Sequence, residues 1–436
     1  MPAHPAPERL VRALPPAVRA VIDRLAEAGH ETVAVGGGVR DALLGRAVTG
    51  LWDLATRALP GEVIALFPHA IPTGVEHGTV TLPDPGGAIE VTSYRSEEGY
   101  SDARRPDRVT FGATLAGDLT RRDFTVNALA YDPRAGVLLD GTGGRADLAA
   151  RLLRAVGDPA ARFREDALRS LRAARLAAVL EFTLEPGTEA ALPLVADLVP
   201  RLSAERVRDE LTRLLLAPRP STGLRVLERA GLLALVLPEL EATRGVTQNR
   251  HHRWDVYEHT LRAIDEAPPG ARLRWAALAH DLGKPATRAV RDDGEATFHG
   301  HAAAGADLTN AMLERLRLPR AEREAIVLLV REHLFDYRAE WTDAAVRRFV
   351  RRVGREALPD LFALRTADAI ATGAEPPRLE AITNLSERIA LVLAAQPPLS
   401  VRDLAIDGKD VMAALAVKPG PVIGTLLERL LEEVLD

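Results

Sequence analysis

The spacing of apolar residues changes near residue 145, and this change limits the folds open to the chain. Before it, helical segments separate short apolar runs, which lie at 33–35, 51–55, 78–82, 88–92 and 137–139. This alternation is typical of a sheet covered by helices. After residue 145, apolar residues recur at helical spacing, as at Val207, Leu211 and Leu214, and no convincing strand follows. We therefore predict an α+β fold, with an α/β head and an all-α remainder.

Composition excludes several classes of protein. The 436 residues include no cysteine, so the chain has no disulfides or thiolate metal sites. The N-terminus has neither a long apolar run nor a cleavable signal pattern, so we expect a cytoplasmic protein that does not enter a membrane. The net charge is only -5, so any polyanion must be bound by local basic patches.

A glycine triplet follows the first apolar run. Gly36, Gly37 and Gly38 lack Cβ atoms, so their backbone N–H groups are open to a triphosphate, and Arg40 adds positive charge. A helix that starts near Val39 would present its N-terminus to the anion. The alternative, more common for isolated glycine clusters, is a plain turn.

Two carboxylates in neighbouring apolar runs are candidate metal ligands. Asp53 and Glu90 each lie in a predicted strand, where a carboxylate either faces solvent or holds a cation. Side chains on a strand alternate between its faces, so the partner of Asp53 is expected two residues earlier. Leu51 occupies that position. We therefore expect a metal site that is one carboxylate short.

Two later segments place arginines beside an aspartate. Arg121 and Arg122 precede Asp123, which we expect to cap a helix, and a helical run places four charged residues on one face, namely Asp166, Arg169, Arg172 and Arg175. An Asp acceptor beside an Arg donor matches the base edge of cytosine and adenine, whereas guanine and uracil have the opposite polarity. The alternatives are an ordinary capped helix and a solvated charged ridge.

These segments resemble the class II tRNA nucleotidyltransferase and poly(A) polymerase family. The resemblance lies, in the family's order, in the strings GGGVRDALLGR, WDLAT, IEVTSYR, RRPDRVTF, DLTRRDFTVNALAYD, LLDGTGGRADL and FREDALRSLRAARLA. It implies a polymerase-beta-like head and untemplated addition of C or A, from CTP and ATP with Mg²⁺, to the 3′ end of tRNA. It also implies that residues 97–107 form a flexible loop that helps the pocket to switch from C to A.

The resemblance assigns roles to individual residues. Asp53 and Glu90 would be the catalytic metal ligands, and the nucleotide would be bound by Gly37, Gly38, Arg40, Arg122, Asp123, Asn127, Asp166, Arg169, Arg172 and Arg175. One departure concerns the family's Asp-x-Asp, whose first acid falls on Leu51 or Gly50. Since a two-metal transfer needs its bridging carboxylates, we expect slow transfer with nucleotide binding retained.

Histidines gather in one later stretch, where a second resemblance appears. The strings VYEHTL, LAHDLGKP, FHGHAAAG and RTADAIA are similar to an HD phosphohydrolase domain. The similarity implies a first metal site of His259, His280, Asp281 and Asp368, with His301 and His333 placed for a second ion. The ions would be Mn²⁺, Ni²⁺, Co²⁺ or Mg²⁺. The alternative is a vestigial domain that serves only as an RNA-binding scaffold.

With both resemblances, we predict four parts. Residues 1–145 form the head, 146–245 a helical neck and body that reads the base and binds RNA, 246–375 the HD domain and 376–436 a helical tail. Because an acid is missing, a second hypothesis stays open: the head is a degenerate binding module, and the HD domain is a metal-dependent 2′,3′-cyclic phosphodiesterase or phosphatase. A third is a noncatalytic tRNA chaperone. The oligomeric state does not follow from the sequence.

Overall fold

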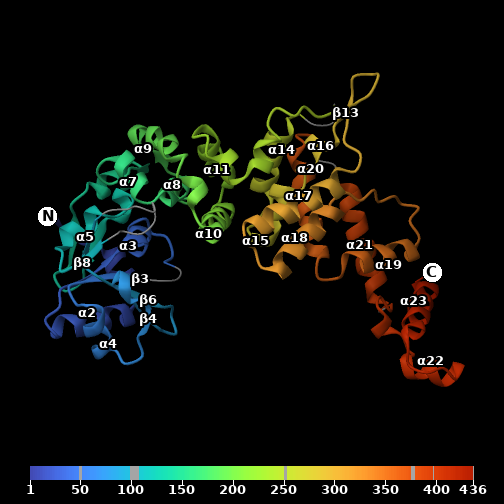
Figure 1. Ribbon diagram of the computed structural model, residues 1–436, viewed down its shortest axis with the longest axis horizontal. Coiled ribbons are helices and arrows are strands. Elements are labelled where there is room, and N and C mark those ends of the chain that lie inside the picture. The colour runs from blue at the N-terminus through green and yellow to red at the C-terminus, as the bar shows by residue number, and fades with distance from the viewer. Residues whose placement is uncertain (49–51, 99–107, 250–252, 375–378, 396, 436) are drawn as a thin grey trace. The chain divides into compact units, whose positions relative to one another are not determined.

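The computed structural model describes the chain except for residues 49–51, 99–107, 250–252, 375–378, 396 and 436 (Figure 1). It consists of two compact units, Met1–Glu210 with Arg225–Val236, and Leu211–Leu224 with Leu237–Asp436. Gly50, Leu51 and most of the loop expected at 97–107 lie outside the described residues, so the missing acid and the switching loop stay predictions. The division into four domains also stays a prediction.

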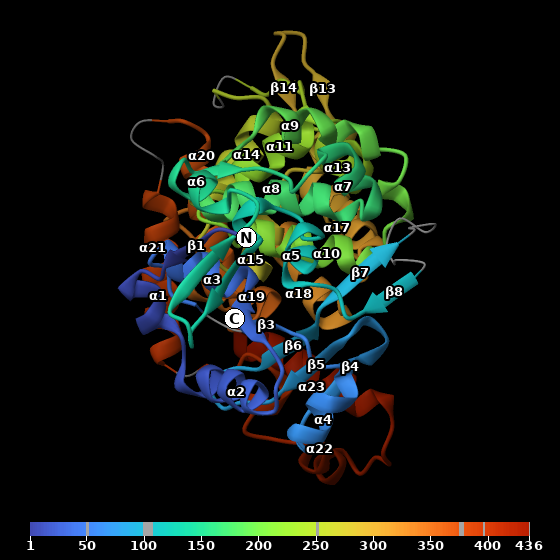
Figure 2. The same cartoon turned by 90° about the vertical axis from the view of Figure 1, so that its left-hand side faces the viewer.

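The first unit contains a mixed eight-stranded sheet. The strands lie in the order β1 (Ala3–Pro5), β10 (Val137–Asp140), β9 (Leu129–Asp132), β2 (Thr32–Val35), β3 (Trp52–Thr56), β6 (Ile89–Ser93), β5 (Thr79–Leu82) and β4 (Ile71–Gly74). Figure 2 shows β3, β6, β5 and β4 side by side. Of these pairs only β3 and β6 run parallel, which sets Asp53 directly beside Glu90.

The strands and helices of the head follow from its apolar pattern. Strand β2 is buried at every residue, as expected for the middle of a covered sheet. Helix α2 (Pro16–Glu27) buries Val18, Val21, Ile22 and Leu25, which recur at helical spacing. The other head helices are α1 (Glu8–Ala13), α3 (Gly36–Leu43), α4 (Pro60–Leu66), α5 (Leu115–Thr120) and α6 (Gly144–Ala149). Strands β7 (Arg95–Glu98) and β8 (Arg108–Phe111) pair separately from the large sheet.

Helices follow the head, as predicted. They are α7 (Pro159–Glu165), α8 (Leu168–Leu180), α9 (Pro186–Ala191), α10 (Ala204–Leu215), α11 (Pro220–Arg229) and α12 (Leu233–Val236). The expectation of no further strand is wrong in detail, because β11 (Leu152–Leu153) pairs with β12 (Thr183–Leu184), and β13 (Ala289–Val290) pairs with β14 (Ala296–Thr297). Such two-residue strands are too short to show an alternating pattern.

The second unit is a helical assembly. Its helices beyond those named above are α13 (Pro238–Glu241), α14 (Val256–Glu266), α15 (Ala271–Ala279), α16 (Lys284–Thr287), α17 (His301–Arg315), α18 (Arg320–Glu332), α19 (Asp343–Val353), α20 (Leu358–Ala371), α21 (Glu380–Ala394), α22 (Gly408–Leu415) and α23 (Pro421–Leu435). The α+β class is therefore confirmed. In the described part of the chain, no helix has the length and apolar character needed to cross a bilayer. The cytoplasmic location stays a prediction.

Candidate active and metal sites

The glycine triplet lies where β2 ends and α3 begins. Gly36 has φ of +75°, and a Cβ there would lie 2.6 Å from Oδ2 of Asp53. A Cβ at Gly38 would lie 3.0 Å from the indole of Trp52. Two of the three glycines are therefore required by close packing, because a side chain would displace the groups around Asp53. Arg40, on the same helix, is buried, and its Nη1 donates to Oδ1 of Asn127 at 2.6 Å.

Asp53 and Glu90 are neighbours on parallel strands, as the metal-site prediction requires. Burial raises the pKa of Asp53, although Arg122 and Arg40 act in the opposite direction. Burial and the charge of Asp53 raise the pKa of Glu90. Two desolvated carboxylates side by side repel each other, and a bound cation would relieve that repulsion. Among the described residues, groups of three or more potential metal ligands occur only in the second unit.

Asp123 is the centre of a charged network. Its Oδ1 accepts from Nδ2 of Asn127 at 2.9 Å, and its Oδ2 accepts from Nη1 of Arg172 at 3.1 Å. Burial alone would raise the pKa of Asp123, but Arg172 and these hydrogen bonds lower it to about 2. The helix expected here is wrong: a 3₁₀ turn at Thr125–Asn127 leads into β9. The apolar residues after Asp123 therefore fill a strand of the sheet.

Arg172 and Arg175 share a buried partner that the sequence did not indicate. Glu210, on α10, accepts from Nε of Arg172 at 3.2 Å and from Nε of Arg175 at 2.5 Å. Only 4% of Glu210 is exposed, so the two cations compensate a desolvated carboxylate. They are therefore held in place before any phosphate arrives.

Asp166 and Arg169 are adjacent but do not pair through their side chains. The amide of Arg169 donates to the carbonyl oxygen of Asp166 at 3.0 Å, and Asp166 lies before α8 rather than within it. The expected common helical face is therefore wrong for Asp166. Oδ2 of Asp166 accepts from Arg206 at 2.7 Å, and Nη1 of Arg169 donates to Glu165 at 2.5 Å. Each member of the pair thus has its own support, and the prediction missed both partners.

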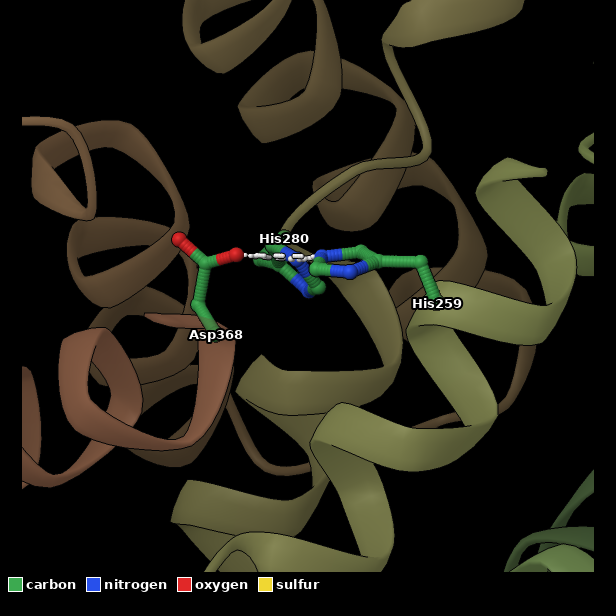
Figure 3. A group of neighbouring side chains, drawn as sticks. All are labelled: His259, His280 and Asp368. Carbon is green, nitrogen blue, oxygen red and sulfur yellow. Dashed lines mark hydrogen bonds and ion pairs between the residues drawn. The ribbon is translucent and has the colours of Figure 1, made fainter. Parts of the chain in front are cut away.

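Six potential ligands meet in the second unit, on five helices or their ends. His259 (α14), His280 (at the end of α15) and Asp368 (α20) form one group, drawn in Figure 3. The Nε2 atom of His259 lies 3.2 Å from Nε2 of His280 and 3.0 Å from Oδ1 of Asp368. The second group is Asp281, His301 and His333. All six are buried and lie together, as the motifs predicted. Asp281, expected in the first group, belongs to the second, although its Oδ2 also lies 3.4 Å from Nε2 of His259.

Backbone carbonyls orient three of these imidazoles. The Nδ1 atoms of His280, His301 and His333 lie 2.8, 2.8 and 2.6 Å from the carbonyl oxygens of Ala277, Phe298 and Val330. A carbonyl oxygen only accepts, so each Nδ1 carries a proton, and in the neutral ring the lone pair is on Nε2. The buried Nε2 of His301 has no hydrogen-bond partner among the described residues and lies 3.5 Å from Oδ1 of Asp281. A divalent ion would satisfy these lone pairs, so the residues fit a metal centre.

The charges of the cluster support the same conclusion. Burial lowers the pKa of His280, but Asp281 and Asp368 outweigh it and raise the pKa to about 10. Burial lowers the pKa of His333 to about 3, and neighbouring cations hold the pKa of Asp281 well below its usual value despite burial. Without a metal ion, Nε2 of His280 is therefore protonated at neutral pH, and a bound ion would replace that proton.

Comparisons with known proteins match both the head and the histidine-rich segment to known domains. Residues 32–154 match the poly A polymerase head domain, residues 181–243 the probable RNA and SrmB-binding site of polymerase A, and residues 250–373 the HD domain. The chain is 40% identical over 418 residues to an A-adding tRNA nucleotidyltransferase of Deinococcus radiodurans, covering 91% of this chain and 90% of that protein. It is 34% identical over 420 residues to a CCA-adding enzyme of Geobacillus stearothermophilus, covering 95% and 91%.

Solved structures show the same relation. The Bacillus stearothermophilus CCA-adding enzyme in complex with CTP superposes with a TM-score of 0.71 at 30% identity, covering 95% of this chain and 91% of that chain. The Thermotoga maritima CCA-adding enzyme complexed with tRNA matches with a TM-score of 0.57 at 18% identity, covering 100% and 95%, which shows the shared fold.

Proposed function

Because this chain belongs to the family of tRNA nucleotidyltransferases and poly A polymerases, we propose that it adds C and A to the 3′ end of tRNA without a nucleic-acid template. The observation that carries the choice of bases is the adjacency of Asp166 and Arg169. An acceptor beside a donor complements cytosine and adenine, and the supports from Arg206 and Glu165 hold that polarity in place. CTP and ATP are the expected substrates.

The proposed work of the head residues follows from their positions. Asp53 and Glu90 would hold Mg²⁺, which supplies neutralisation of the phosphates and activation of the primer hydroxyl. Gly37, Gly38 and Arg40 bind the triphosphate, together with Arg122. Asp123 and Asn127 fix Arg40 and Arg172 in position. Arg172 and Arg175, which Glu210 holds in position, would contact phosphate.

The test is primer extension on tRNA that lacks its 3′ end, with CTP or ATP singly and Mg²⁺. We expect slow incorporation by the natural chain, at least tenfold faster incorporation by Leu51→Asp, and none by Asp53→Asn, since each carboxylate neutralises a cation. Binding of CTP to Asp53→Asn, measured calorimetrically, separates lost binding from lost transfer. No product from either the natural chain or Leu51→Asp would refute the proposal and favour a degenerate binding module.

We also propose that the HD domain hydrolyses a phosphate ester with a divalent metal. The convergence of the three oriented Nε2 lone pairs with Asp281 and Asp368 carries this second function. Bound Mn²⁺, Ni²⁺, Co²⁺ or Mg²⁺ would polarise the phosphate and activate water. We expect Asp281→Ala to abolish hydrolysis of p-nitrophenyl phosphate and Asp307→Ala, whose carboxylate is 83% exposed on α17, to preserve it. Hydrolysis that survives in Asp281→Ala would contradict the assignment.

A further inference from the structure

A cavity of about 470 Å³ opens onto the HD metal-ligand cluster. Four of the ligands line it, namely Asp281, His301, His333 and Asp368, and two cations line it as well, Lys284 and Arg365. A substrate in this cavity would touch both the ions and these cations. The HD proposal leaves Arg365 without a role.

Arg365 lies one helical turn before Asp368 on α20. Its Nη1 pairs with Oδ2 of Asp368, and Oδ1 of the same carboxylate lies 3.0 Å from Nε2 of His259. The two oxygens of Asp368 are thus divided between the cluster and Arg365. The arginine side chain is 28% exposed, and its described contacts engage Nη1 alone. The rest of the guanidinium fork is available to a ligand in the cavity.

Lys284 differs from Arg365 because its ammonium group already contacts several neighbours. Its Nζ lies 2.7 Å from Oδ2 of Asp281 and 2.6 Å from Oε1 of Gln248, and it stands 5.6 Å from the ring centre of Phe298. Only 7% of the lysine side chain is exposed. Lys284 is therefore fixed by neighbours, and Arg365 is the cation better placed to contact a phosphate.

The balance of charge favours a doubly charged ligand. Two divalent ions would bring more positive charge than Asp281 and Asp368 offset, and Lys284 and Arg365 add to the excess. A terminal phosphate monoester is largely a dianion at neutral pH, whereas a cyclic phosphodiester carries a single charge. The monoester also leaves more oxygens free for the guanidinium fork.

We propose that Arg365 binds the non-bridging oxygens of a terminal phosphate monoester at the HD site, and that it thereby selects monoesters over cyclic phosphodiesters. The inference rests on the proposed phosphohydrolase function. Arg365 also positions Asp368, so its contact with phosphate must be measured apart from metal binding and apart from turnover.

The experiment uses calorimetry on the full chain, first with Mn²⁺ and then with inorganic phosphate at saturating Mn²⁺. The variants are Arg365→Gln and Arg365→Lys, with Arg320→Gln as control, because Arg320 is an exposed arginine of the same unit that pairs with Glu324 on one helix. We expect Arg365→Gln to weaken phosphate binding at least tenfold, Arg365→Lys to recover part of it, and Arg320→Gln to match the natural chain.

A comparison of KM values for a phosphate monoester and a cyclic phosphodiester tests the proposed substrate preference. In Arg365→Gln, KM for p-nitrophenyl phosphate should rise at least tenfold, while KM for 2′,3′-cyclic AMP should change by less than threefold. Unchanged phosphate binding, weakened Mn²⁺ binding with normal phosphate affinity, or an equal rise in both KM values would each overturn the proposal. If the natural chain binds Mn²⁺ but no phosphate, only the proposed role of Arg365 is overturned. If the natural chain binds no Mn²⁺, the phosphohydrolase assignment is overturned as well.

Discussion

At the scale of single residues, the first site consists of charges that hold one another. Arg40, Asn127, Asp123, Arg172 and Glu210 form an unbroken chain of contacts. Charged groups fixed in this way lose little conformational freedom when a nucleotide binds, which favours tight and oriented binding.

Gly36 allows the phosphate loop to touch Asp53, so we expect Gly36→Ala to abolish C and A incorporation. A Cβ would both require an unfavourable φ and push against Oδ2 of Asp53. The free energy of unfolding should fall by about 1 to 3 kcal/mol. Gly61→Ala on α4 is the matched control, because nothing lies within 4 Å of its Cβ position. Urea unfolding and primer extension measure both effects, and an active Gly36→Ala enzyme would contradict the proposed close approach.

The ion pair of Asp123 should make the free energy of unfolding depend on pH in acid. Its pKa is lowered to about 2 from the ordinary value of 3.8, so its ion pair stabilises the fold fully above pH ~4. That stability is lost as the pH falls toward 2, and it amounts to about 2 kcal/mol. We expect the free energy of unfolding of Asp123→Asn to be lower at pH 5 and to change less between pH 4 and pH 2. The exposed Asp197→Asn serves as control; identical pH slopes in all three proteins would show that the pair does not contribute.

Motifs found the charged residues of both sites, but not the partners that hold them in place. Glu165 lies within the string FREDALRSLRAARLA, but nothing in the sequence pairs Arg206 with Asp166, forty residues away. Such pairings depend on how distant segments pack, which spacing along the chain does not encode. The HD ligands were predictable because each belongs to a distinctive short string.

At the scale of elements, one buried arginine ties two helix ends together in the second unit. Arg274, on α15, is 3% exposed. It donates to the carbonyls of Leu215, the last residue of α10, and of Ala217 just after that helix, and to the carbonyl of Ala267, just after α14. Carbonyls at helix C-termini lack partners within their own helix. A single guanidinium satisfies both ends.

We expect Arg274→Lys to lower the free energy of unfolding by about 2 kcal/mol or more, because an ammonium cannot reach both helix ends and leaves carbonyls buried without donors. Arg272→Lys, two residues earlier on the same helix, should change it by less than about 0.5 kcal/mol, since Arg272 is 43% exposed. Thermal and urea unfolding provide the measurement. Equal losses in the two variants would show that the carbonyl contacts of Arg274 are not decisive.

Apolar patterns in the sequence predicted some strands of the head well and one segment wrongly. Strands β2, β5 and β6 were predicted within one residue because apolar runs bounded by turn residues mark them. The segment after Asp123 was read as a helix because its apolar spacing fits both periods over so short a stretch. Part of this segment, β9, is a strand because it pairs with β10 and β2, and the sequence of the segment alone does not reveal its pairing partners.

At the scale of the whole molecule, each proposed activity draws its residues from one compact unit. Asp53 and Glu90 belong to the first, and the six HD ligands belong to the second. We therefore expect Asp281→Ala to retain the incorporation rate on tRNA within twofold, and Asp53→Asn to retain hydrolysis of p-nitrophenyl phosphate within twofold. Parallel assays on the same preparations test this, and a tenfold loss of either unaltered activity would reveal coupling.

The main-chain carbonyls behind His280, His301 and His333 have a consequence for how the HD centre can change over evolution. The direction of each ring depends on main-chain geometry, which is that of α15 for His280, of α18 for His333 and of the turn before α17 for His301, so neighbouring side chains can be exchanged without turning the rings. Drift in the surrounding sequence would then alter which ester enters and how fast it reacts, while the residues that would hold a divalent metal stay oriented. A centre of this kind could acquire new substrates without rebuilding the residues that would hold its ion.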